Sequence, residues 1–263
     1  LIILGGTWSD YSLAYQIWFV RELFRALNDG SKAQNNIAKR RTQYEHAGIS
    51  SDVATLKKQV APLQERIANQ ELSYNQAFDL HYAISEAWGT VATWQSATWE
   101  ELETEHRTNE TAHHRVVGLV IETRPERITP HHAYTLRRLG CTKVQMGIQS
   151  LDERVRKQNN RPTTNAQIQS AFETLRLFGF KTHIHAMVNL LGATPESDKQ
   201  DYLHLVEGKP FQPDEIKLYP CVLVDGTGLC AHYQDHTWKP YSEEELIEVL
   251  VADTCATPAF TRI

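Results

Sequence analysis

The chain has 263 residues, of which 41% are hydrophobic and 22% charged, a composition typical of a globular protein. Its formal net charge is -5, which argues against a broadly basic nucleic-acid-binding surface but leaves room for a local basic patch. No apolar run approaches the roughly 18 residues that a transmembrane helix needs, so no membrane span is expected.

Cysteine usage indicates a reducing, cytoplasmic compartment. The four cysteines are scattered, with no C-x-x-C pair: Cys141, Cys221, Cys230 and Cys255. So few cysteines in a chain of this size do not form a disulfide framework. Residues 1–4 are apolar but too few for a signal peptide, and no initiator Met precedes them. We therefore expect a fragment that begins inside a strand.

Short apolar runs alternate with helical patterns along most of the chain. The runs predict strands at 1–4, 116–122, 143–150, 181–190 and 215–220. Apolar residues at three- and four-residue steps predict helices around 13–27, 133–139, 168–177 and 246–250. This alternation is typical of βαβ units, which build a parallel sheet wound into a barrel or a doubly wound layer.

Residues 35–112 interrupt this alternation, and we interpret them as a helical insertion within a core that otherwise spans 1–263. Apolar residues there follow a heptad spacing: Val53, Leu56, Val60, Leu63 and Ile67. Pro62 predicts a kink or a break in that helix. The insertion is either a docking hairpin for a protein partner or tRNA, or an ornament that packs on itself or on the barrel. The second interpretation is favoured, because heptads without basic clustering usually only pack helices.

The first strand is followed by Gly5-Gly6-Thr7. In parallel α/β folds the carboxyl ends of the strands carry the site, and two glycines let the backbone approach a ligand closely. On its own this turn is a weak signal.

The second strand ends at Glu122, and Arg124 follows two residues later on the same face, held extended by Pro125. A carboxylate can accept from a ribose hydroxyl, and a guanidinium can bind a carboxylate or phosphate. A mutual salt bridge at the sheet edge is an equally good explanation.

The third strand ends in Gln149 and Ser150, two small polar groups, and Arg161 follows a short helix. Arg161 could reach back to the strand ends as an anion clamp. Alternatively, its segment is a capping loop in which Thr163 or Thr164 is the N-cap of the next helix.

Two later strands each carry a pair of polar residues on one face. His183 and His185 resemble half of a metal site, but no third ligand is evident and metal binding is not favoured. Lys217 and Tyr219 share a face in the last strand. A buried lysine there needs an anionic partner, either a substrate or a glutamate on a neighbouring strand.

Taken in order, these segments resemble the catalytic subunit of Elongator and its bacterial and archaeal relatives. The resemblance covers 1–30 and about 107–263. The matching segments include Leu4-Gly5-Gly6-Thr7-Trp8, Glu122-Thr123-Arg124-Pro125-Glu126, Gly140-Cys141-Thr142-Lys143-Val144, Gly147-Ile148-Gln149-Ser150, Leu190-Leu191-Gly192-Ala193-Thr194-Pro195-Glu196, Ile216-Lys217-Leu218-Tyr219-Pro220 and Gly226-Thr227-Gly228-Leu229.

The resemblance implies a partial (β/α)6 TIM-like barrel of the radical S-adenosylmethionine type. It implies that Gly5, Gly6 and Thr7 meet the methionine amino group of the cofactor. Gln149, Ser150 and Arg161 would then hold its ribose and carboxylate. Glu122 and Arg124 would line the same mouth, and Lys217 and Tyr219 would lie near acetyl-CoA or tRNA. These expectations rest on the family and not on spacing alone.

The implied reaction uses a 4Fe-4S cluster to reduce S-adenosylmethionine, and the resulting radical takes a hydrogen from the acetyl group of acetyl-CoA. The acetyl carbon then adds to C5 of the wobble uridine of tRNA. The cofactors supply the chemistry, and the protein orients them.

The sequence departs from the family in four ways. The three cluster cysteines that the family carries before the Gly-Gly-Thr turn are missing, although thiolates hold such clusters. The acetyltransferase domain is missing as well. Val188 replaces a proline of the family, and the insertion at 35–112 is long. We therefore expect this fragment to be inactive. A coproporphyrinogen-oxidase-like enzyme and a non-catalytic binding module remain alternatives.

Overall fold

A computed structural model describes residues 1–5 and 7–263. They divide into two compact units. The sheet unit comprises Leu1–Asp10 and Val117–Ile263, and the helical unit comprises Tyr11–Val116. No helix in the described ranges combines the length and the apolar character needed to cross a membrane.

The sheet unit is built on five parallel strands, which confirms the predicted α/β class. They are β1 (Ile2–Ile3), β2 (Val120–Thr123), β3 (Lys143–Gln149), β4 (Lys181–Val188) and β5 (Glu215–Pro220), and they lie in the order β1-β2-β3-β4-β5. An isolated parallel bridge joins Glu215 to Arg262 at the outer edge of β5. The second strand begins later than the predicted residue 116, because the Val116 amide instead donates to Asn109 Oδ1 at 2.7 Å.

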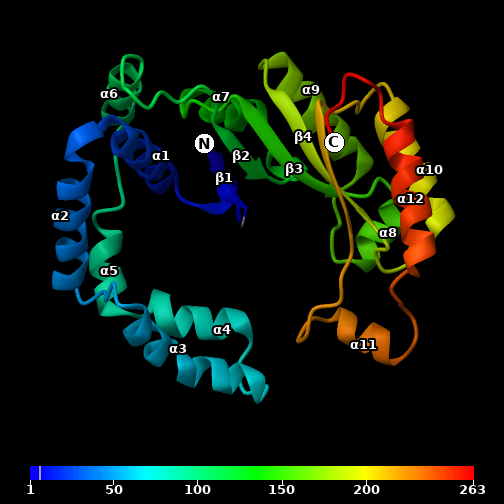
Figure 1. The fold of residues 1–263 in the computed structure, drawn as a ribbon, viewed down its shortest axis with the longest axis horizontal. Helices are drawn as coiled ribbons and strands as arrows, with labels where there is room; N and C mark the ends of the chain where they lie inside the picture. The colour runs from blue at the N-terminus through cyan, green and yellow to red at the C-terminus, as the bar shows by residue number, and fades with distance from the viewer. Residues whose placement is uncertain (6) are drawn as a thin grey trace. The chain divides into compact units, whose positions relative to one another are not determined.

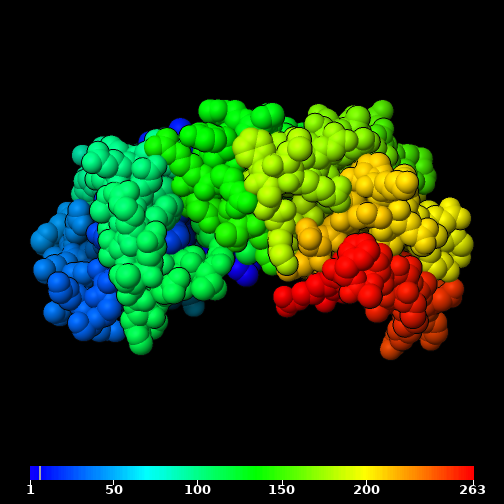
Figure 2. All heavy atoms as spheres, turned by 90° about the horizontal axis from the view of Figure 1, so that it is seen from above, coloured from blue at the N-terminus to red at the C-terminus, as the bar shows by residue number. Residues whose placement is uncertain are grey.

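Helices follow the strands, and most of them lie along the outer side of the curved sheet, whereas the helix at Leu229–Gln234 lies apart from it (Figure 1). They are α7 (Pro130–Arg138), α8 (Glu153–Gln158), α9 (Asn165–Leu177), α10 (Pro195–Glu207), α11 (Leu229–Gln234) and α12 (Glu243–Ala256). In Figure 2 the red atoms of α12 lie directly against the yellow atoms of α10. Lys199 Nζ on α10 donates to Glu248 Oε1 on α12 at 2.8 Å, which ties the pair at its exposed edge.

Side chains of β3, β4 and β5 alternate between two faces of the sheet, with a register shift between Gly147 and Gln149. On the apolar face, toward the helices, the side chains of β3 and β4 are buried: Val144, Met146, Ile148, Ile184 and Val188. Burial of each such side chain stabilises the fold by roughly 1.5–3 kcal/mol. On the polar face, charged and polar residues lie side by side in register: Glu122, Lys143, Gln145, His183, His185, Glu215, Lys217 and Tyr219.

The helical unit contains α1 (Leu13–Asn28), α2 (Ala33–His46), α3 (Val53–Ala68), α4 (Tyr74–Phe78), the π-helix η3 (Asp79–Ala83), α5 (Glu86–Ala92) and α6 (Trp99–Asn109). It is wider than residues 35–112 because α1 packs against α6. Asn28 Nδ2 donates to Glu105 Oε2 at 2.8 Å across that contact.

Pro62 lies inside α3 and does not end it, so a break at this residue is wrong. Proline removes one backbone hydrogen bond, to the carbonyl of Lys58. Both residues are exposed, so water can satisfy that carbonyl.

Candidate functional site

His185 lies at the centre of the polar face, near the carboxyl ends of the strands. Its Nδ1 is 3.7 Å from Glu122 Oε1, and its Nε2 contacts the Gln145 amide. Its ring centroid is 5.8 Å from that of Tyr219. Burial lowers the pKa of His185, Glu122 opposes that shift, and the charges of Lys217 and Arg161 add to it. The imidazole is therefore neutral at neutral pH and serves as a hydrogen-bonding group.

Tyr219, one of the two predicted substrate-contacting residues, is half-buried beside His185. Burial raises its phenol pKa, Glu122 raises it further, and Arg161 lowers it. The phenol therefore stays protonated at neutral pH and can donate a hydrogen bond. Glu122 and Arg161, which act on both aromatic rings, lie close to them.

Lys217, the other predicted substrate-contacting residue, is exposed, so the expectation that it is buried is wrong. Its strand is the last of the sheet, and its face is open. Within the described part of the chain its ammonium makes no ion pair. A lysine–glutamate pair across strands forms instead at the amino ends of the strands, where Lys143 Nζ on β3 donates to Glu215 Oε2 on β5 at 2.7 Å. Lys217 is therefore available to an external anion.

Arg161 is held at the same end of the sheet by its backbone. Asn160 adopts a left-handed conformation with φ 55°, and the Arg161 amide donates to the Arg156 carbonyl at 2.8 Å. Its guanidinium has no hydrogen bond or ion pair to any residue that the structure describes. A cation without a protein partner fits an anionic ligand group.

The loop that carries Arg161 depends on Arg156, which sequence reasoning missed. Arg156 is 1% exposed and donates to Thr163 O at 2.8 Å and to Asn165 Oδ1 at 2.7 Å, and it also contacts Ser150 O. No sequence pattern distinguishes this buried arginine from the exposed Arg154 nearby.

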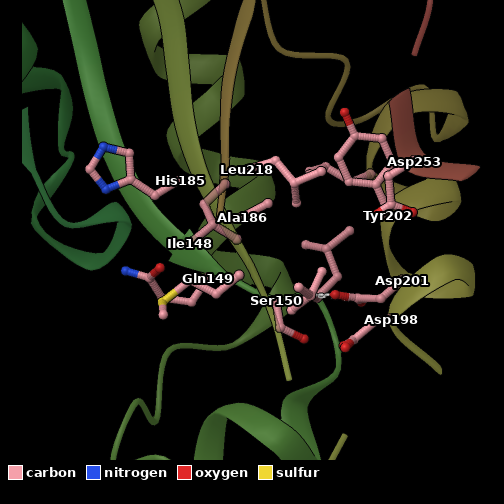
Figure 3. A pocket seen from close by; sticks show the side chains of 14 residues that line it. Ile148, Gln149, Ser150, His185, Ala186, Asp198, Asp201, Tyr202, Leu218 and Asp253 are labelled. Carbon is pink, nitrogen blue, oxygen red and sulfur yellow. Dashed lines mark hydrogen bonds between the residues drawn. The ribbon is translucent and has the colours of Figure 1, made fainter. Parts of the chain in front are cut away.

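Gln149 ends β3 in a left-handed conformation with φ 73°. Its Oε1 is buried and finds no hydrogen-bond partner among the described residues. A Cβ at Gly147 would lie 3.0 Å from Gln149 Nε2, so glycine leaves room for this amide. Figure 3 shows the amide on the same side of the strands as His185. The carbonyl oxygen is free to accept from a ligand.

Ser150 is turned the other way. Its buried Oγ accepts from the Asp152 amide at 3.0 Å, and its side chain also hydrogen-bonds Asp201. Figure 3 shows Ser150 on the side of Asp198 and Asp201, opposite His185. The structure therefore does not bring the Ser150 hydroxyl together with the Gln149 amide.

Arg124 pairs with Glu126 instead of Glu122, with Nη2 and Oε1 2.5 Å apart. Glu126 Oε2 also accepts from Thr163 Oγ1 at 2.9 Å, which joins this segment to the Arg161 loop. The alternative of a Glu122–Arg124 bridge is therefore wrong, and Glu122 faces His185. In the loop after Arg161, Thr164 is the N-cap of α9, which confirms one of the two N-cap residues predicted there.

The turn after β1 is fixed to the end of β2. Gly5 has φ +95°, and Thr7 O accepts from the Asp10 amide at 2.9 Å. Ser9 Oγ lies 2.5 Å from Thr123 Oγ1 and 3.2 Å from His132 Nε2. Gly6 lies outside the described residues.

The histidine pair does face one way, with ring centroids 5.9 Å apart. Burial lowers the pKa of His183 to about 4, with Glu215 opposing and Lys217 adding to the shift. Its Nδ1 lies 3.3 Å from Glu215 Oε2, while its buried Nε2 has no hydrogen-bond partner among the described residues. Across residues 1–5 and 7–263, no group of three or more His, Cys, Asp or Glu residues is placed to hold a metal ion.

The four cysteines are all free thiols. Burial raises the pKa of Cys141 to about 12, and its thiol donates to Lys143 O at 3.2 Å. Burial also raises the pKa of Cys221. Neither microenvironment favours the thiolate that metal ligation requires.

Two family models match the chain. One, described as the Radical SAM superfamily, matches residues 89–204, and the other, described as the Radical_SAM C-terminal domain, matches residues 213–263.

Among curated relatives, the tRNA uridine(34) acetyltransferase of Methanocaldococcus infernus is 34% identical over 163 residues, which cover 62% of this chain and 30% of that protein. Elongator complex protein 3 of Homo sapiens is 32% identical over 149 residues, which cover 57% of this chain and 27% of that protein. The matched part of the chain spans less than a third of either relative.

A solved structure, the archaeal Methanocaldococcus infernus Elp3 with residues 1–46 deleted, is 26% identical with a TM-score of 0.70. The match covers 100% of this chain and 46% of that one. It therefore includes residues 35–112 as well as the sheet unit, so this segment is not a departure from that relative.

Proposed function

Because this chain belongs to the radical SAM superfamily, we propose that it is the S-adenosylmethionine-binding core of an enzyme that modifies the wobble uridine of tRNA. The name of the archaeal relative, tRNA uridine(34) acetyltransferase, supports the choice of substrate. Acetyl-CoA as the second substrate, and carboxymethyl formation at C5, belong to the same proposal. The matched residues span less than a third of either relative, so the whole activity would also depend on parts outside this match.

One observation carries the proposal: two groups that face one end of the sheet lack protein partners. The Gln149 carbonyl oxygen is a buried acceptor, and the Arg161 guanidinium is an unpaired cation. The amino acid and ribose parts of S-adenosylmethionine offer a carboxylate for the guanidinium and hydroxyl donors for the amide. Glu122 can accept from the ammonium or a hydroxyl. The donor set therefore fits the cofactor, which when bound supplies the means to abstract a hydrogen atom.

The remaining predicted contacts stay within this proposal. Gly5, Gly6 and Thr7 would offer backbone groups to the methionine ammonium. Arg124 is half-exposed beside Glu126 and would close the mouth from the β2 side. Ser150 would contribute through the loop that it stabilises, because its hydroxyl is engaged with Asp152 and Asp201.

The residues described here do not fit a 4Fe-4S cluster. Such a cluster needs several convergent thiolates, whereas Cys141 is buried with a raised pKa and no metal-holding group is found in the described ranges. We therefore assign this chain the cofactor face and no cluster ligand. Anaerobic reconstitution of this chain with iron and sulfide should leave less than one iron per chain by colorimetric assay. Stoichiometric loading of four irons would overturn this assignment.

We assign the substrate contacts to Lys217 and Tyr219. The exposed ammonium of Lys217 would bind a phosphate of acetyl-CoA or tRNA. The protonated phenol of Tyr219 would donate to a substrate carbonyl or phosphate oxygen. A partner protein on the helical unit belongs to the same proposal.

The cofactor is tested by titrating S-adenosylmethionine into the isotope-labelled chain and following the backbone amide of Ser150 by NMR in every variant, together with the Gln149 side-chain amide wherever that residue is kept. A saturable shift is expected. Gln149→Ala and Arg161→Ala should each raise the dissociation constant roughly tenfold, the loss of one charge-assisted or buried hydrogen bond. Arg154→Ala, which removes an exposed arginine paired with Asp152, is the matched control and should leave the constant unchanged. Non-saturable shifts, or equal losses in all three variants, would refute the site.

A further inference from the structure

Two carboxylates of α10 reach the loops that follow β3 and β4 from the apolar face. Both oxygens of Asp201 accept from the Leu151 amide at 2.9 Å, and Asp201 also hydrogen-bonds the Ser150 side chain. Asp198, which is 6% exposed, accepts at Oδ2 from the Asn189 amide at 2.7 Å and from the Tyr241 hydroxyl at 2.7 Å. Each carboxylate therefore holds the backbone immediately after one strand.

Those two loops contain left-handed residues. Gln149 has φ 73°, and Asn189 has φ 62°. A side chain in this region costs on the order of 1 kcal/mol unless surrounding contacts hold it there. The Asp201 bond lies two residues after Gln149, and the Asp198 bond falls on Asn189 itself. The carboxylates are thus placed to stabilise the strained turns.

Asn189 is held on three further sides. Its Oδ1 accepts from the Tyr241 amide at 2.9 Å, its Nδ2 donates to Lys239 O at 3.2 Å, and its carbonyl accepts from Trp238 Nε1 at 2.9 Å. The loop after β4 is therefore rigid, although Val188 stands where the family has proline. Asp198 and Asp201 are three residues apart, on one side of α10. One helix thus supports both strand ends.

A small cavity of about 10 Å³ is lined by Asp198, Asp201 and a third acid, Asp253 on α12. Unlike the other two carboxylates, that of Asp253 accepts from no loop amide in the described part of the chain. It is 1% exposed, and its Oδ2 has no hydrogen-bond partner among the described residues. Burial raises its pKa to about 7, with Asp198 and Asp201 adding to the shift and Lys199 opposing it. The cavity has room for about one water molecule. Asp253 is therefore a natural control for the other two.

We propose that Asp198 and Asp201 are positioning residues that, through the Asn189 and Leu151 amides, place the Gln149 amide and the loop after β4 for cofactor binding. They do not touch the ligand themselves. The proposal rests on the proposed function only for the identity of that ligand. Their effect on the two backbone amides is independent of it.

The experiment compares Asp201→Ala, Asp201→Asn and Asp253→Asn in the whole chain. Amide hydrogen exchange of Leu151 reports the loop, the Gln149 side-chain shift reports S-adenosylmethionine binding, and thermal unfolding reports the fold. Asp201→Ala should exchange Leu151 at least tenfold faster and bind about tenfold more weakly. Asp201→Asn keeps one acceptor oxygen and should restore most of both. Asp253→Asn should change neither. Asp198→Ala should show the same loss at the Asn189 amide.

The outcomes separate the two proposals. If the wild-type chain does not bind S-adenosylmethionine while Asp201→Ala still exposes Leu151, the proposed ligand is wrong and the support of the loop stands. If the wild-type chain binds and Asp201→Ala binds equally well, positioning is overturned. It is also overturned if Asp201→Asn lowers binding as much as Asp201→Ala, or if Asp253→Asn does so, because the effect is then a general loss of structure.

Discussion

The two faces of the sheet come from the same alternating strands but have opposite compositions. On the apolar face, Val144, Met146 and Ile184 are fully buried against helices. On the polar face, Gln145 on β3 pairs in register with His183 on β4, which pairs in turn with Glu215 on β5. Parallel strands that are covered on both faces usually read as continuous apolar runs. The alternation in β3, β4 and β5 therefore indicates that the polar face is not packed as a second apolar core.

The largest expected difference between the faces is in core packing. Ile184→Ala should lower the free energy of unfolding by about 2–5 kcal/mol, because it removes buried methyl groups and leaves a cavity. Lys217→Ala, on the exposed polar face, should change it by less than about 0.5 kcal/mol. Urea unfolding of both variants measures the two changes in the free energy of unfolding. Equal losses would mean that the polar face is also part of the core.

Gly208 tests how closely the chain that leaves α10 lies against the last turn of that helix. A Cβ at this position would lie 2.5 Å from the backbone oxygen of His204, so Gly208→Ala should cost about 1–3 kcal/mol. Gly118→Ala is the matched control, because its Cβ would meet only Thr142 Oγ1 at 3.4 Å. Thermal unfolding should separate the two by several degrees. Similar melting temperatures would show that the end of α10 yields freely.

Asp253→Asn should make the chain more stable at high pH. Folding raises the pKa of Asp253 from its ordinary value near 3.8 to about 7, so the folded state binds the proton more tightly. The stabilisation that the bound proton gives the folded state is therefore complete at low pH and is lost as the pH rises toward 7. At pH 8 the variant should gain roughly 1–3 kcal/mol over the wild type, and at pH 4 much less. A pH-independent difference in urea unfolding would contradict this.

The smallest effect belongs to the ion pair on the polar face. Burial opposes ionisation of Glu215, but Lys143 outweighs it, with His183 and Arg262 assisting, so the pKa of Glu215 is lowered. This contribution is present above the ordinary glutamate pKa and is lost as the pH falls through the folded value. Glu215→Gln should cost about 1 kcal/mol at pH 7 and almost nothing at pH 3. Equal costs at both pH values would indicate lost packing rather than lost charge.

Sequence periodicity predicts the apolar face and the presence of the strands well. Apolar and polar residues alternate through 143–149 and 181–188, so both the five strands and the face of His183 and His185 follow directly. The resemblance to a known family adds the positions of Gln149 and Arg161 near the strand ends. These features are local in sequence or tied to short motifs, which is why they could be predicted.

The supports of the site could not be predicted in this way. Asp198 and Asp201 read as ordinary residues of an exposed helix, and only the fold places them under β3 and β4. Lys143, rather than Lys217, forms the ion pair with Glu215, because Glu215 is the first residue of β5 and lies at the same end of the sheet as Lys143. Partners such as Asp201 and Leu151, 50 residues apart, or Lys143 and Glu215, 72 residues apart, are brought together by the register and curvature of the sheet, which a single sequence does not show.

The attachment of both strand ends to α10 has a consequence for how this region can vary. A change in the tilt of that helix would move the Gln149 turn and the Asn189 turn together, since Asp201 and Asp198 are bonded to their backbones. The ligand-facing loops thus behave as a single mechanical part. Variants selected for a new ligand would have to adjust α10, which supports both loops, and not only the residues that face the ligand.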